Sequence, residues 1–268
     1  MKKIKTYLNK REETLFQLLE RERKYFEPIT YNKLCIEIRK IMALLELMSY
    51  SKEKVDVKRI LKPFKKIYEQ AEIIKGLQDR EAMLKRFIPG PLLKSFRTDV
   101  RRDKLNKIQI FFELPESSIG KKIRKRFLKL NDAADDISRK KGNAFLEKSR
   151  KKIEKILKTE NPVTTTYHEL KDKMEGYQTL TDCIQPNEEK THIEKRANLS
   201  DLLNRYFDFE VMLGFIEEMA IIHGIPKVEA KPIEKIRTDL LARLELVKNS
   251  IEIAISEGLF FSQKAEEI

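Results

Sequence analysis

The run Tyr31-Asn32-Lys33-Leu34 recurs in altered form as Tyr167-His168-Glu169-Leu170. A second run, Asp79-Arg80-Glu81-Ala82-Met83-Leu84, follows the first copy, and Asp208-Phe209-Glu210-Val211-Met212-Leu213 follows the second. Two matched blocks in the same order and at similar spacing indicate an internal duplication. We therefore predict one domain over residues 1–268, with a first helical half at 29–158 and a second at 162–256.

The composition is typical of a helical protein. Of the 268 residues, 41% are hydrophobic, which suffices for a core, and 37% are charged. Glycine (8) and proline (9) are sparse, while Leu, Ile, Lys, Glu and Arg dominate. The length fits one large domain or two closely packed halves.

Apolar residues recur at helical spacing along nearly the whole chain, and no window alternates as a strand does. Pro63 is expected to kink its helix or to mark the true start. The segment 119–158 is expected to divide at Gly142-Asn143. The tail after Gly258 is expected to be loosely held, although Leu259-Phe260-Phe261 could dock. The predicted helices cover residues 8–25, 30–48, 55–87, 92–112, 119–158, 167–184, 190–220 and 232–256.

The chain is strongly basic. Lysine and arginine number 56 against 43 aspartates and glutamates, a formal net charge of +13. Such an excess repels itself unless a polyanion or an anionic surface compensates it. Nucleic acid, inorganic polyphosphate, acidic lipid and nucleotide-like ligands are all candidates, and a charged solubility surface is the alternative.

Other features bear on the compartment. Cys35 and Cys183 lie in apolar helical contexts and are expected to be buried thiols, without a disulfide. The N-terminal residues lack the apolar core of a signal peptide, and no apolar run is long enough to cross a membrane. We expect a cytoplasmic protein without membrane insertion.

The repeated helix starts resemble those of the CHAD family, the conserved-histidine α-helical domain. In that family each half begins with a His-x-Leu-Arg type start, with further basic residues one and two turns on. The second half here keeps His168, Leu170 and Lys171. The first half has Asn32 where the histidine is expected and Cys35 where the first arginine is expected.

Further basic and acidic positions extend the resemblance over roughly residues 30–254. The first half keeps Arg39 and Lys40, and the aspartate of the family's later Arg-Asp or His-Asp pair is present as Asp79 and Asp208. Gln78 and Phe207 stand where the basic member of that pair is expected.

The resemblance implies an all-α fold of two antiparallel bundles of long helices, related by a pseudo-two-fold axis around a basic central groove. It also implies inorganic polyphosphate as ligand and association with polyphosphate granules. On this basis Asn32, Asp79 and Asp208 are expected to orient other side chains. The polyanion is expected to contact Arg39, Lys40, Lys58, Lys62, Lys65, Lys66, Lys148, Arg150, Lys151, His168 and Lys171.

Spacing supports a binding role for some of these residues. Lys58, Lys62, Lys65 and Lys66 recur at i, i+4, i+7 and i+8, which aligns them on one helix face. Lys171 follows His168 by three residues, so both can reach one anion, and a helix that starts at His168 offers unpaired backbone N–H groups. A lysine stripe can also be a plain solvated face, and this alternative stays open.

Two other functions remain possible from sequence. A non-specific nucleic-acid binder would have the same charge, but no DNA- or RNA-reading motif is present. A degenerate helical scaffold that has lost its ligand would explain Asn32, Cys35, Glu175 and Phe207. An enzyme is not expected, since no phosphate loop, nucleophile motif, metal-ligand cluster or cofactor signature is found. Oligomerisation is possible but is not predicted.

Overall fold

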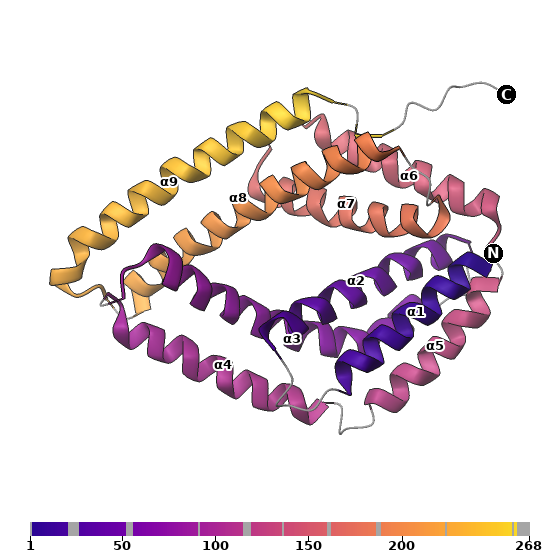
Figure 1. Cartoon of the computed structure of the whole chain (residues 1–268), viewed down its shortest axis with the longest axis horizontal. Helices are drawn as coiled ribbons and strands as arrows, with labels where there is room; N and C mark the ends of the chain where they lie inside the picture. The colour runs from indigo at the N-terminus through magenta and orange to yellow at the C-terminus, as the bar shows by residue number, and fades with distance from the viewer. Residues whose placement is uncertain are drawn as a thin grey trace. The chain divides into compact units, whose positions relative to one another are not determined.

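Helices account for all the regular structure in the described part of the chain. The computed structural model describes residues 2–20, 27–51, 56–90, 92–114, 119–135, 137–159, 162–185, 189–222, 224–258 and 260–261. Within these ranges lie nine helices and no strand, which confirms the all-α prediction (Figure 1). They are α1 (Lys2–Leu19), α2 (Pro28–Ser51), α3 (Val57–Phe87), α4 (Lys94–Leu114), α5 (Gly120–Asp135), α6 (Arg139–Leu157), α7 (Thr164–Ile184), α8 (Lys190–Ile222) and α9 (Lys227–Ser256).

Several helix starts follow from local chemistry. Pro28 is the first residue of α2, where a missing N–H costs nothing. Asp56 Oδ1 accepts a hydrogen bond from the Arg59 N–H at 3.0 Å at the start of α3. Pro63 lies in the second turn of α3, so the helix begins before this proline and not at it.

The predicted break at Gly142-Asn143 is wrong. The break falls earlier, where the Ser138 side chain accepts a hydrogen bond from the Lys141 N–H at 3.2 Å and caps α6. Gly142 lies inside α6 and is buried, and a Cβ there would come within 3.3 Å of the Ile184 side chain. The glycine therefore allows close approach of α6 and α7, and does not end a helix.

Two later helices begin before their predicted starts. The α9 helix begins at Lys227, so Pro232 lies within it and does not open it. The α7 helix begins at Thr164, one turn before the predicted start. His168 is thus the fifth residue of α7, and the unpaired N–H groups expected beside it belong to the preceding turn. Residues 21–25 of the predicted first helix lie outside the described residues.

Unit 1, the first of two compact units, comprises residues 1–75 and 106–187. Within it α2 packs against α1 and α7, and α6 packs along α7 (Figure 1). Tyr31 is fully buried and meets Phe111 edge to face at 5.2 Å between ring centroids. Phe64 and Phe127 make a similar contact at 5.5 Å. These aromatic pairs and the apolar stripes of α2 and α7 form the core of the unit.

Unit 2 comprises residues 76–105 and 188–268. Its long helices α8 and α9 lie side by side (Figure 1). Phe96 and Phe215 meet edge to face at 4.5 Å. Phe260 and Phe261 are buried after α9, and the Phe260 carbonyl accepts a hydrogen bond from Arg196 at 2.8 Å. The predicted docking of this segment is confirmed for these two residues, while Leu259 lies outside the described residues.

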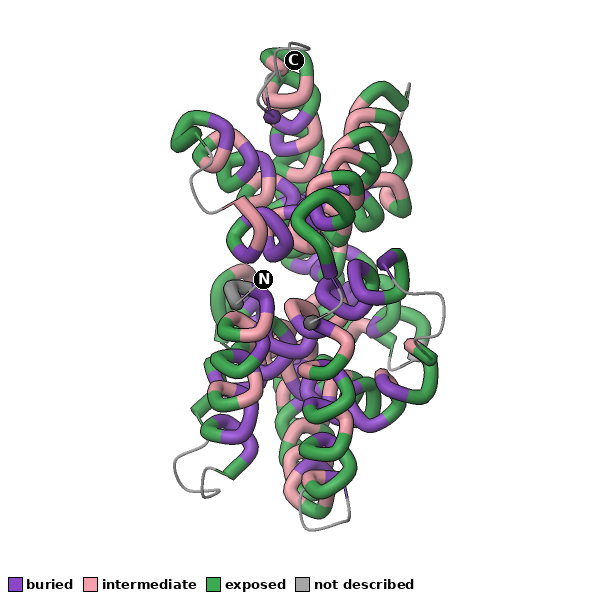
Figure 2. Tube along the Cα trace, turned by 90° about the vertical axis from the view of Figure 1, so that its right-hand side faces the viewer, coloured by how far each residue is buried: buried purple, intermediate pink, exposed green. Residues whose placement is uncertain are grey.

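Most of the repeated residues belong to the core. Tyr31 and Tyr167 are each 1% exposed, and the repeated Met and Leu pairs of the later runs are buried as well. Figure 2 shows buried residues alternating with exposed ones along the helices, as amphipathic helices require. Core packing therefore accounts for these repeated positions, and the two-fold relation of the halves stays a prediction.

The expectation for the cysteines is also met. Cys35 and Cys183 are buried free thiols, and burial raises the pKa of Cys183 to about 12. Among the described residues, the helices are all too short or too polar to cross a membrane.

Candidate functional site

Two basic side chains predicted to bind anions lie beside a carboxylate in unit 1. Arg39 of α2 donates a hydrogen bond from Nη1 to Oε2 of Glu175 on α7 at 2.5 Å. Lys171 Nζ lies 4.0 Å from the same carboxylate. Arg39 and Glu175 occupy equivalent positions when Tyr31 is aligned with Tyr167. The two repeat starts are thus brought together, with opposite charges where α2 and α7 meet.

A third cation, Lys75 of α3, also affects the protonation of Lys171. Burial lowers the pKa of Lys171, the Glu175 carboxylate opposes this, and the positive charges of Arg39 and Lys75 lower it further. Mutual repulsion among these cations means that an added anion would be stabilised there. We call Arg39, Lys75 and Lys171 the α2–α3–α7 cluster.

Lys40 belongs to a different arrangement. Its Nζ lies 2.9 Å from Oε1 of Glu37, a buried residue that also holds Arg11. Arg11 Nη1 donates to both Glu37 oxygens at 2.9 and 2.8 Å. Because Lys40 already has a carboxylate partner, its charge is less available to a ligand than a free ammonium would be.

The lysines on α3 are exposed. Lys58, Lys62, Lys65 and Lys66 all face solvent, while Phe64 and Ile67 of the same turns are buried. None of the four lysines makes an ion pair with any residue that the structure describes. The four can therefore meet an anion without first breaking an internal contact, and the same exposure fits a plain solvated face.

Two of the three α6 cations predicted to bind the polyanion are paired within their own helix. Arg150 lies 3.4 Å from Glu147 and 3.2 Å from Glu154. Lys151 lies 4.0 Å from Glu147, and Lys148 stands over the Tyr50 ring at 5.1 Å. These contacts neutralise part of the positive charge that the sequence of α6 suggested.

The remaining predicted residues divide between the units. Asn32 and His168 are each the fifth residue of their helix, and Asn32 is half-buried whereas His168 is exposed. Asp79 on α3 and Asp208 on α8 belong to unit 2, whereas all the predicted basic residues belong to unit 1. The orienting role of the two aspartates stays a prediction.

Some functional candidates escaped the sequence analysis. Lys75 falls outside the lysine run of α3, and its relation to Lys171 depends on tertiary packing. Three arginines of unit 2, Arg86, Arg205 and Arg243, lie on three separate helices and line one pocket. No motif joins them in sequence. Among the described residues, no group of three or more His, Cys, Asp or Glu side chains is placed to hold a metal.

Comparison with known proteins identifies the fold. No protein-family model matches the chain, and no curated protein matches it by sequence. Among solved structures it is similar to the crystal structure of the CHAD domain from the plant Ricinus communis, with a TM-score of 0.75. The chain has the CHAD fold. The alignment covers 96% of this chain and 92% of the plant domain at 12% sequence identity. At this identity the likeness establishes the CHAD fold and carries no ligand with it.

Proposed function

We propose that this chain is a non-catalytic polyanion-binding module whose ligand is inorganic polyphosphate. The observation that carries the proposal is the α2–α3–α7 cluster, in which Arg39 and Lys171 contact one carboxylate, Glu175, and Lys75 adds a third positive charge near Lys171. The exposed lysines of α3 in the same unit would extend the contact along the ligand. On this proposal the protein is expected in the cytoplasm, at polyphosphate granules.

The chemistry of polyphosphate suits such a surface. The polymer carries about one charge per phosphate and has no bases to read, so it asks for many cations and no catalytic geometry. Arg39 can clamp two phosphate oxygens with its planar fork, whereas lysines act as point charges. A bound phosphate would favour the charged form of Lys171, whose pKa is lowered by burial and by the charges of Arg39 and Lys75.

A second candidate function is a helical scaffold that has lost its ligand. The Arg39–Glu175 pair favours it, because an internal carboxylate takes the place where a phosphate would sit. The internal pairing of Arg150 on α6 points the same way. Non-specific nucleic-acid binding is the third candidate and follows from the net charge alone.

The test is a titration of the full chain with long-chain polyphosphate at several salt concentrations. Replacing both Arg39 and Lys171 by Gln should weaken binding by roughly tenfold or more. The slope of log K against log salt concentration should become less steep, as expected for the loss of about two phosphate contacts. Replacing Lys121 and Lys122 by Gln is the matched control, because both are exposed on α5 and carry the same total charge.

Each outcome separates the candidates. Equal effects of the two double substitutions would remove the cluster from the ligand surface. Affinity for polyphosphate no greater than for heparin or duplex DNA would favour a non-specific binder, and no binding would favour the scaffold. The length of the polyphosphate should not change on incubation with the protein, and any shortening or extension would contradict the non-catalytic assignment.

A further inference from the structure

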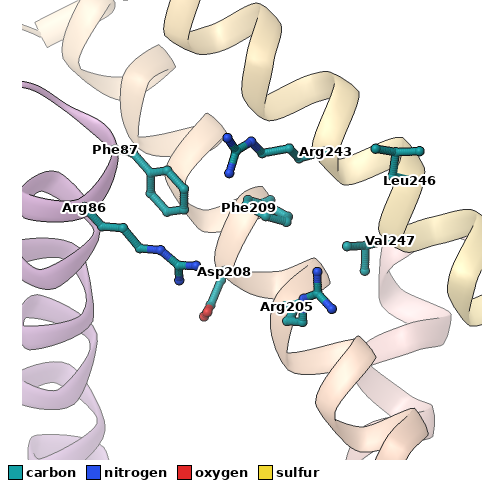
Figure 3. Close-up of a pocket in the computed structure, with 8 residues that line it drawn as sticks. All are labelled: Arg86, Phe87, Arg205, Asp208, Phe209, Arg243, Leu246 and Val247. Atoms are coloured by element: carbon teal, nitrogen blue, oxygen red, sulfur yellow. The ribbon is translucent and has the colours of Figure 1, made fainter.

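Unit 2 contains a pocket that the proposed function does not use. Its volume is about 180 Å³, and its walls come from the C-terminal end of α3 and from α8 and α9 (Figure 3). All three segments belong to the same compact unit. The residues that line it are Arg86, Phe87, Arg205, Asp208, Phe209, Arg243, Leu246 and Val247.

The rim of the pocket is positively charged. Three guanidinium groups and one carboxylate, that of Asp208, leave a formal excess of two positive charges. Arg86, Arg205 and Arg243 make no ion pair with any residue in the described ranges. Some other arginines of the unit are paired: Arg237, for example, lies 3.2 Å from Glu234. Like charges gathered from three helices repel one another, and one carboxylate does not balance three guanidinium groups, so an anion bound among them would be stabilised.

The floor of the pocket is apolar. The rings of Phe87 and Phe209 lie 5.8 Å apart at 60°, and Phe209 and Val247 are buried. Leu246 stands at the rim with 67% of its surface exposed. Figure 3 shows the two rings beside each other, with Arg86 and Arg243 reaching toward them from different helices. Such a site suits a ligand that has one anionic group and a small apolar body.

We propose that this pocket binds a small phosphomonoester that carries an apolar or aromatic group. A phosphomonoester has a charge of about −1.5 to −2 at neutral pH, which matches the excess charge of the rim. Arginine forks can hold its oxygens, and the phenylalanine rings can cover the attached group. The pocket is smaller than the roughly 300–1,000 Å³ of sites for drug-sized ligands, which favours a phosphate joined to a single ring.

This second site has none of the basic residues of the polyphosphate surface. Its residues lie in unit 2, whereas the α2–α3–α7 cluster lies in unit 1. It also differs in chemistry, since the cluster meets a chain of phosphates and the pocket offers an apolar floor for an organic group. Either proposal can therefore fail while the other holds.

Calorimetric titration of the full chain with phenyl phosphate tests the proposal. We expect saturable binding to one site per chain. Substitution Arg243→Gln should weaken it by roughly tenfold, as for the loss of a charge-assisted hydrogen bond. Arg101→Gln is the matched control, because Arg101 is an exposed arginine on α4 of the same unit. Equal effects of the two substitutions, or no saturable binding, would overturn the proposal.

A second variant tests the apolar part of the site. Leu246→Asn should weaken the binding of phenyl phosphate by about threefold, since part of an exposed apolar contact is lost. It should leave the binding of inorganic phosphate unchanged. The exposure of Leu246 means that folding is not at risk. If phenyl phosphate and inorganic phosphate bind equally well to the native chain, the organic part of the ligand is wrong.

The two proposals are told apart with one more measurement. The double variant Arg39→Gln with Lys171→Gln should bind phenyl phosphate as tightly as the native chain does. Loss of phenyl phosphate binding in that variant, with its thermal unfolding unchanged, would show that the pocket does not act as a separate site.

Discussion

Removing Glu175 should strengthen the binding of polyphosphate. In the native chain this carboxylate neutralises Arg39 at 2.5 Å and partly neutralises Lys171 at 4.0 Å. Substitution Glu175→Gln keeps the size and hydrogen-bonding ability of the side chain and removes its charge. If the α2–α3–α7 cluster holds the ligand, both cations become more available and a repulsive charge disappears.

The size of the gain follows from the positions of these charges. The side chains of Arg39 and Glu175 are 28% and 35% exposed, so the effective dielectric constant lies between those of protein and water. For a phosphate roughly 6 Å from the carboxylate and a dielectric constant of about 50, Coulomb's law gives a repulsion of about 1 kcal/mol. The substitution should therefore tighten binding roughly sixfold at low salt and less at high salt.

Fluorescence anisotropy with end-labelled polyphosphate measures this effect. Glu169→Gln is the control, because Glu169 is an exposed carboxylate on α7 and the change in net charge is the same. If affinity is unchanged or falls with Glu175→Gln, or rises equally with Glu169→Gln, the cluster does not contact the ligand. A melting curve by circular dichroism establishes that both variants fold.

Three further expectations concern stability. Lys171→Met should stabilise the fold at neutral pH while weakening polyphosphate binding. The folded state lowers the pKa of Lys171, so the charged form of this lysine disfavours folding. The destabilisation, and with it the stabilisation gained from Met, should shrink as the pH rises through the pKa of the folded state. Thermal unfolding of both chains at a series of pH values would check this dependence. Glu37→Gln should lower the free energy of unfolding by about 3–5 kcal/mol, because Arg11 stays buried beside a neutral partner. In urea titrations the double substitution Arg11→Met with Glu37→Leu should lower the free energy of unfolding by less than Glu37→Gln does. An equal or larger loss would contradict this explanation. Gly142→Val should cost about 1–3 kcal/mol through overpacking against Ile184, and adding Ile184→Ala should restore part of the loss.

Helical periodicity was sufficient to locate most of the elements. The stripes of α2 and α7 and the long run of α8 were predicted within a few residues, because apolar positions at helical spacing must face a core. The errors arose where one residue type has two uses. Gly142 was expected to end a helix, but it serves close packing against Ile184. Pro232 was expected to open α9, but it is the sixth residue of a helix that begins at Lys227, where it removes one backbone hydrogen bond without ending the helix.

The candidate sites could be predicted only in part. Arg39 and Lys171 were found because they stand at the repeated helix starts, and they do lie near one carboxylate. Lys75 was missed, as were the pocket arginines, because each reaches its site from a different helix. Sequence spacing reports which residues share a face of one helix, and it says nothing about which helices meet.

The sequence by itself determined the all-helical class, the buried faces of the helices and the strongly basic charge, since these depend on local periodicity and composition. Only the tertiary structure decided which charges are available to a ligand. Packing set Arg39 against Glu175 and Arg11 against Glu37. It also gathered Arg86, Arg205 and Arg243 around one pocket that holds a single carboxylate, that of Asp208. The physical reason is that electrostatic energy depends on distance and burial, and both arise only when helices far apart in sequence come together.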